Sequence, residues 1–220
     1  MEIAKLLLEY LKVLAWPSVI LTIVLVFRKQ IESLIKRLEK ADLPGGVSIS
    51  LRAEILEAKK LSEQVIAEPL PSQAKGVQSL PLTEANLRML KLGLQPSPSG
   101  LNVDYYRDIV GDDPNLALAG LRLEVDVLAK NLATGFGVDV TPEDSGGRLV
   151  KKLHDAGAIT LQQAKFIQKI LQLANAGVHG TSVSPREANQ IINIAGVLVD
   201  QYIAWLSWGF NDGWQPKQQR

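Results

Sequence analysis

The stretch Asp113–Ala133, "DPNLALAGLRLEVDVLAKNLA", decides the fold of this chain. Asp113 followed by Pro114 predicts a helix start, because a short acidic side chain caps free backbone N–H groups and proline suits the first helical position. Apolar side chains then recur at helical spacing, which predicts a helix that ends near Ala133. The apolar side expected for this helix consists of Leu116, Leu118, Leu121, Leu123, Val127 and Leu128.

Three further helices are expected C-terminal to this one, each from apolar residues at helical spacing. The clearest start is a capping box of Ser184 and Glu187, in which each side chain binds a backbone N–H group of the other residue. The loop before the first of these helices carries a small capping pattern, Thr141 to Asp144. The pattern therefore predicts a compact all-α bundle. Its three helices are expected at Arg148–Asp155, Leu161–Ala174 and Pro185 to about Leu206.

The composition excludes several chemical mechanisms. The chain has 220 residues, with 24 Lys and Arg against 23 Asp and Glu, so no strong basic field indicates a nucleic-acid partner. It has no cysteine, which removes disulfides, thiolate metal sites and cysteine nucleophiles. His154 and His179 are its two histidines, so a histidine-rich metal site is not expected. We therefore expect neither a metal nor a cofactor.

An apolar segment near the start predicts a membrane anchor. Val13–Phe27, "VLAWPSVILTIVLVF", has no charged residue and is apolar on every helical face, as a helix in lipid should be. Extended back to Leu6 it has about 22 residues, which rise about 33 Å and can cross a hydrocarbon core of about 30 Å. The residues expected in membrane lipid are Trp16, Pro17, Val19, Ile20, Leu21, Ile23, Val24, Leu25 and Phe27.

The charges around this segment predict whether it is cleaved and how it is oriented in the membrane. A cleaved signal peptide is the alternative, but acid and base mix at its start and no cleavage site of small residues follows. Five cations follow the segment, whereas Lys5 and Lys12 precede or enter it, so the positive-inside rule places the rest of the chain in the cytoplasm. We expect a single-pass protein of the cell inner membrane. The five cations are Arg28, Lys29, Lys36, Arg37 and Lys40.

Composition changes along the chain predict five segments. Residues 1–40 are expected to form the transmembrane anchor and a juxtamembrane helix, and residues 41–67 a short extended segment at Val47–Leu51 and a helix. Residues 68–103 are rich in Pro, Ser and Gly and predict a largely extended, flexible linker with one short helix, Glu84–Lys91. The helical bundle is expected over residues 104–210, and a tail over residues 211–220.

Large aromatic residues gather near the C-terminus, in "WLSWGFNDGW". Tryptophan and phenylalanine fill cores, but they also lie at membrane surfaces and at protein interfaces. The sequence leaves these alternatives open. The residues considered for an interface are Trp205, Trp208, Phe210 and Trp214.

The helix order, with "LQLANAGVHG" before the capped "SPREANQIINIAGVLVDQYI", resembles the HEPN superfamily over residues 104 to 207. It is most similar to a bacterial branch of unknown function that is often attached to a membrane helix. In catalytic members, an arginine precedes a histidine by a few residues. The two residues form an active site in a dimer cleft, and the protein is a metal-independent ribonuclease. The histidine transfers protons and the arginine binds phosphate. Asn175 and His179 match the polar and histidine positions, but Ala174 stands where the arginine is expected.

The resemblance leaves three roles open for these residues: catalysis, binding of a ligand or nucleotide, and a structural role. A cation is needed to stabilise phosphoryl charge, and Arg122 could supply it if it points at His179, with Glu124 nearby on the same helix. Alternatively, Asn175 and His179 form hydrogen bonds that hold the corner between two helices. The residues considered for catalysis are therefore His179, Asn175, Arg122 and Glu124.

These observations predict a membrane-anchored, non-catalytic binding or assembly module that forms a homo-oligomer, dimeric or higher. One alternative is a membrane-tethered HEPN-type ribonuclease or toxin of a defence system, although RNA is the less favoured partner. Another alternative is a structural subunit of a membrane complex that contacts another membrane protein.

Overall fold

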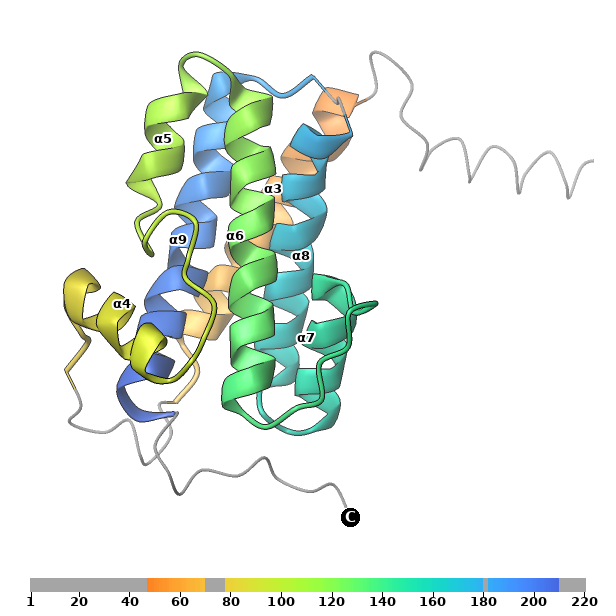
Figure 1. Cartoon of the computed structure of the whole chain (residues 1–220). Coiled ribbons are helices and arrows are strands. Elements are labelled where there is room, and N and C mark those ends of the chain that lie inside the picture. Colours follow the sequence, from red (N-terminus) through yellow and green to blue (C-terminus); the bar gives the residue numbers. More distant parts are fainter. Residues whose placement is uncertain (1–46, 70–77, 180–181, 210–220) are drawn as a thin grey trace, which may run out of the picture. The chain divides into compact units, whose positions relative to one another are not determined.

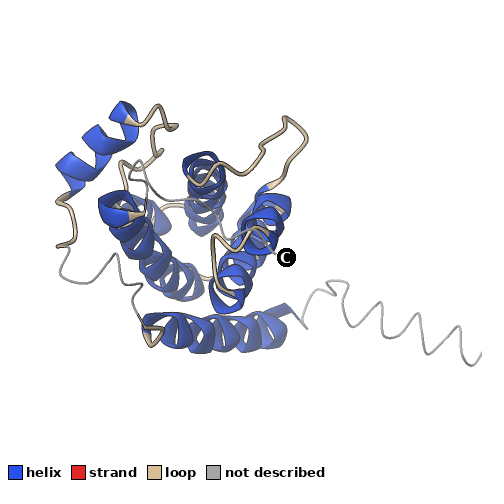
Figure 2. Cartoon of the chain, turned by 90° about the horizontal axis from the view of Figure 1, so that it is seen from below, coloured by secondary structure: helices blue, strands red, loops and turns tan. Residues whose placement is uncertain are grey.

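A computed structural model describes residues 47–69, 78–179 and 182–209 of the chain. All regular secondary structure in these residues is helical, which confirms the predicted all-α class (Figures 1 and 2). The helices are α3 (Val47–Ile66), α4 (Leu82–Lys91), α5 (Asp104–Val110), α6 (Pro114–Gly135), α7 (Gly146–Asp155), α8 (Leu161–Val178) and α9 (Pro185–Trp208).

The helix α6 is the centre of the bundle and contacts α5, α7, α8 and α9 (Figure 1). The predicted cap is confirmed, because the Asp113 side chain accepts hydrogen bonds from the backbone N–H groups of Asn115 and Leu116, at 2.9 and 3.0 Å. Most of the predicted apolar side is buried, with Leu118, Leu121 and Leu128 fully inaccessible to solvent. Each buried leucine stabilises the fold by about 1.5–3 kcal/mol.

Two of the residues predicted for the apolar side of α6 are exposed instead. Leu116 is 59% and Leu123 is 62% exposed. They lie seven residues apart and so share one face of the helix. The described helices leave this face uncovered, so helical spacing identified an apolar face that the bundle does not bury.

The start of α9 confirms the predicted cap, and α8 begins with a cap of the same kind. In both helices a capping box is complete, with Thr160 and Gln163 at α8 and Ser184 and Glu187 at α9. These interactions connect residues three apart, so the local sequence is sufficient to specify them.

The extended segment predicted at Val47–Leu51 is wrong, because these residues form the first turns of α3. A lone strand would leave its backbone N–H and C=O groups unpaired, whereas a helix pairs them internally. The helix also continues a buried stripe with spacings of four and three residues. Its members are Leu51, Ile55, Ala58, Ser62 and Val65.

The helix α3 lies along one side of the bundle (Figure 2) and is held there partly by charge. The Lys169 ammonium of α8 contacts Glu54 and Glu57 of α3, each at 2.6 Å. Burial alone would lower the pKa of Lys169, but its hydrogen bonds to the two glutamates raise it above the usual value. At the other end of α3, Glu68 accepts a hydrogen bond from the Thr160 hydroxyl at 2.8 Å.

The sequence predicts a largely extended linker over residues 68–103, but the described residues of this range pack on the bundle. Its short helix exists as α4, and residues 94–101 pack on the bundle, with Leu94 5% and Leu101 2% exposed. The sequence did not predict the short helix α5, which begins at Asp104.

Among the described residues, no helix combines the length and the apolarity needed to cross a bilayer. The predicted anchor, from Leu6 to Phe27, lies outside the described residues. Phe210, Trp214 and the Trp208 side chain lie outside them as well. Trp205 is 4% exposed and packs edge-on against Phe136 with ring centroids 6.2 Å apart, so it belongs to the core.

Candidate functional site

Asn175 and Arg122 form a polar pair between α8 and α6. The Arg122 Nε donates a hydrogen bond to the Asn175 Oδ1 at 2.8 Å. The guanidinium also forms an ion pair with Asp126, one turn further along α6. The Arg122 side chain is only 18% exposed, so its charge is largely removed from water and its two partners compensate for this.

A close approach of α6 and α8 brings this pair together. A Cβ on Gly177 would lie 2.5 Å from the Asn115 backbone oxygen and 2.6 Å from the Leu118 Cβ, so only glycine fits there. Gly177 follows Asn175 on α8 but packs against residues that precede Arg122 on α6. The two helices are therefore antiparallel.

His179 is the C-cap of α8 and is exposed. Its backbone N–H donates to the Asn175 backbone oxygen at 3.0 Å. No hydrogen bond or ion pair of its imidazole is found within the described residues. Arg122 contacts Asn175, which lies about 6 Å before His179 along the helix axis. The structure thus directs the cation to Asn175 rather than to the imidazole.

Ala174 occupies the position where the resemblance implies a catalytic arginine. Its side chain is fully buried, with 0% exposure. A guanidinium there would have to enter the core of the bundle, where an unpaired charge is strongly unfavourable. Position 174 faces the core, which suits alanine and not arginine.

Glu124 does not belong to the Asn175 site. It is two residues from Arg122, so it points to the far side of α6. Its carboxylate is completely buried and accepts hydrogen bonds from Ser97 Oγ at 2.5 Å, Ser99 N at 3.0 Å and Tyr106 Oη at 2.9 Å. Burial, together with the Glu124 charge, raises the pKa of Tyr106. Glu124 therefore anchors the segment between α4 and α5.

Asn131 is a second anchor that the sequence reasoning missed. Its Oδ1 accepts from Gln95 N at 2.9 Å, and its Nδ2 donates to Gln95 O at 2.7 Å. It lies seven residues after Glu124 and so on the same face of α6. The sequence contained one signal for this contact. Two polar residues that lie two helical turns apart on one buried face of α6 indicate that a polar segment packs there.

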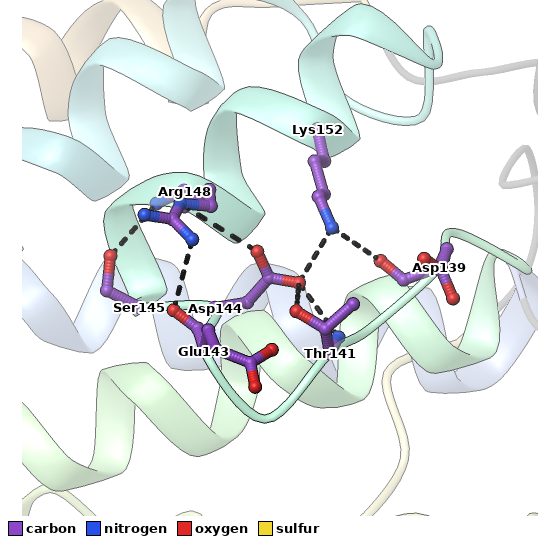
Figure 3. Close-up of polar contacts among 7 residues, drawn as sticks. All are labelled: Asp139, Thr141, Glu143, Asp144, Ser145, Arg148 and Lys152. Carbon is purple, nitrogen blue, oxygen red and sulfur yellow. Dashed lines mark hydrogen bonds and ion pairs between the residues drawn. The ribbon is translucent and has the colours of Figure 1, made fainter.

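A third polar cluster fixes the loop before α7 (Figure 3). The Asp144 carboxylate is 1% exposed and accepts from Lys152 Nζ at 2.7 Å and from Thr141 N and Oγ1 at 2.8 and 3.1 Å. Its hydrogen bond with Lys152, and then that with the Thr141 backbone, lower its pKa to about 2. The predicted Thr141 to Asp144 contact is confirmed, while the N-cap of α7 itself is Ser145.

The fold and these contacts define a helical-bundle domain whose candidate site is a partly buried arginine–asparagine pair beside an exposed histidine. In the part of the chain that the structure describes, no group of three His, Cys, Asp or Glu residues is placed to hold a metal ion. Comparisons with protein-family models, with curated proteins and with solved structures find no match to this chain. The HEPN resemblance therefore rests on the sequence motif alone.

Proposed function

We propose that this chain is a membrane-anchored, HEPN-like assembly module whose cytoplasmic helical domain self-associates without catalysing a reaction. The observation that carries the proposal is an exposed apolar surface beside the candidate site. It consists of Leu116 and Leu123 of α6 and Val178 of α8, and is called the α6–α8 face below. Their exposed fractions are 59%, 62% and 53%.

The geometry of the two helices supports treating these residues as one surface. Leu116 and Leu123 share a face of α6, and the contact of Gly177 with Asn115 brings the end of α8, including Val178, to the start of α6. The Arg122–Asp126 ion pair nearby adds no net charge. An apolar surface suits a two-fold contact, in which the same surface of each copy faces the other.

The apolar contribution is of the same size as the cost of association. Burying the exposed parts of six such side chains, three from each copy, contributes about 5–10 kcal/mol, because each is a little over half exposed and full burial of one contributes about 1.5–3 kcal/mol. Association costs about 4–15 kcal/mol in lost motion. Anchoring both copies in one membrane would reduce that cost, because it raises their effective concentration.

The environment of the candidate site argues against ribonuclease activity. Arg122 is engaged by Asn175 and Asp126, and Ala174 is buried at the position of the expected catalytic arginine. A guanidinium already paired with a carboxylate is less able to stabilise the extra charge of a phosphoryl transition state.

The test is the oligomeric state of the full chain in detergent, measured by light scattering after size exclusion. We expect the wild type to be a defined oligomer and Leu123→Asp to shift it toward the monomer. Leu56→Asp is the matched control, because Leu56 of α3 is also 62% exposed but lies on another helix. A monomeric wild type, or equal effects of the two substitutions, would refute the proposal.

A membrane-tethered ribonuclease is the second candidate, favoured by one observation. A cation reaches Asn175, one turn from the exposed His179. This function requires that the wild type cleaves RNA and that His179→Ala abolishes cleavage while the helical circular dichroism stays unchanged. Absence of cleavage by the wild-type oligomer would remove this candidate.

A further inference from the structure

The uncovered side of α6 carries opposite charges at its two ends. Asp112 and Asp113, at the start of the helix, are exposed, and so is Lys130 toward its end. Lys130 lies seven residues after the exposed Leu123 and therefore on the same side of α6. Within the described residues, no ion pair of Asp112 or Lys130 is found. This side of the helix thus has an acidic end, an apolar middle and a basic end.

This order of charges is self-complementary in one orientation of two copies. When two α6 helices pack antiparallel about a two-fold axis, the acidic end of each lies beside the basic end of the other. In a parallel pair, Lys130 would lie beside the same lysine of the second copy, and the aspartates beside aspartates. Like charges brought together in this way are unfavourable. The charges therefore favour the antiparallel pair.

The spacing along α6 brings the opposite charges within reach. A contact centred between Leu116 and Leu123 places each leucine opposite the other leucine of the second copy. At 1.5 Å per residue, Lys130 is then about 16 Å from the centre, and the two aspartates are about 10–11 Å from it. The flexible four-carbon stem of lysine can cover the remaining offset of about 5 Å.

We infer that two copies of this chain associate with α6 packed antiparallel on α6. Leu116 and Leu123 make the apolar centre of the contact, and Asp112 pairs with Lys130 of the other copy at each end. The inference rests on the proposed function, because it requires the α6–α8 face to be the surface of self-association. Exposed ion pairs add little affinity, so their main effect is to disfavour the parallel arrangement.

A distance measurement tests the orientation, and the absence of cysteine makes it direct. Thr134, exposed near the end of α6, is replaced by cysteine in the full chain and labelled with a nitroxide. It lies about 22 Å from the centre of the contact, so an antiparallel pair places the two labels about 44 Å apart. A parallel pair would place them less than about 20 Å apart, since packed helix axes are about 8–10 Å apart. Double electron–electron resonance in detergent measures the distance, and the shorter value would overturn the inference.

Charge reversal tests the ion pairs in the same detergent. Lys130→Glu should raise the dissociation constant of the dimer about tenfold, because two attractive contacts per dimer become repulsive. Adding Asp112→Lys to this variant reverses both ends and should restore the wild-type constant, measured by sedimentation equilibrium. Lys60→Glu is the matched control, because Lys60 of α3 is also exposed and the change in net charge is the same. Equal effects of the two single substitutions, or no rescue by the double substitution, would contradict the pairing.

The wild-type oligomer separates failure of this inference from failure of the proposed function. A monomeric wild type refutes both. If Leu123→Asp dissociates the oligomer but the labels at position 134 lie close together, the proposed function stands and the antiparallel arrangement is wrong. The same conclusion follows if Lys130→Glu leaves the dissociation constant unchanged. A label distance of about 44 Å together with the charge-reversal rescue supports the arrangement.

Discussion

Glu124 shows how a single buried carboxylate can order a segment that is distant in sequence. Its three hydrogen-bond donors come from residues 18 to 27 positions earlier, at Ser97, Ser99 and Tyr106. Such a group stabilises the fold only while all its partners are present, because a buried donor without an acceptor is costly.

We therefore expect Glu124→Ala to lower the free energy of unfolding by about 3–5 kcal/mol, since it leaves several buried donors unpaired. The measurement is denaturant unfolding of the full chain in detergent, followed by circular dichroism. Glu143→Ala is the control, because Glu143 is exposed and, among the residues that the structure describes, only its backbone oxygen forms a hydrogen bond. Its effect should stay below about 0.5 kcal/mol. Similar losses in both variants would contradict the anchoring role.

Asp144 predicts a specific pH dependence of stability. Its pKa is about 2 in the folded protein and 3.8 ordinarily, so the folded state favours the charged form. This contribution is present above pH 3.8 and is lost as the pH falls toward about 2. The stability difference between wild type and Asp144→Asn should therefore shrink over this range. A difference that stays constant with pH would show that the charge of Asp144 does not stabilise the loop.

At the residue scale, the sequence predicted interactions between near neighbours. The caps at Asp113 and Ser184 were correct because each joins residues two or three positions apart. The anchoring roles of Glu124 and Asn131 could not be predicted, since their partners lie in a Pro- and Ser-rich segment whose composition indicates flexibility.

At the scale of helices, the decisive contact is that between α6 and α8. The backbone of Gly177 lies so close to α6 that no side chain fits. This approach positions Asn175 for Arg122, so the candidate pair requires glycine, which has no Cβ, at position 177.

Gly177→Ala should destabilise the protein by about 1–3 kcal/mol, although alanine has the higher helix propensity, because its Cβ would meet backbone atoms that cannot move aside. Thermal unfolding measures the effect. Gly147→Ala is the matched control, since a Cβ at this helical glycine of α7 meets nothing within 4 Å. We expect the control to be neutral or stabilising by up to about 1 kcal/mol. A stabilising Gly177→Ala would refute the close approach.

Helix prediction failed where a short pattern fitted two structures. Val47–Leu51 alternates like a strand, yet Leu51 also begins the helical stripe of α3. Five residues are too few to distinguish the two-residue period of a strand from the helical period of about 3.6 residues. The packing of α3 against the bundle decides in favour of the helix.

The proposed organisation of the whole molecule gives a further prediction. The double substitution Ile20→Lys and Val24→Lys should move the chain from the membrane to the soluble fraction, because each lysine costs about 2.5–3.5 kcal/mol at the centre of a membrane helix. Fractionation followed by an alkaline wash measures this. Leu56→Lys, on the exposed side of α3, should leave the chain in the membrane fraction. A wild-type chain that is freely soluble without detergent would refute the anchor.

The sequence by itself determined that the described part of this protein is helical and where most of its helices begin, because caps and helical periodicity act over three or four residues. Only the tertiary structure decided that Leu116 and Leu123 are exposed, that residues 94–101 are fixed by Glu124 and Asn131, and that Arg122 binds Asn175. Each of these depends on how distant elements pack, and the pattern of one helix does not specify which of its neighbours will cover it.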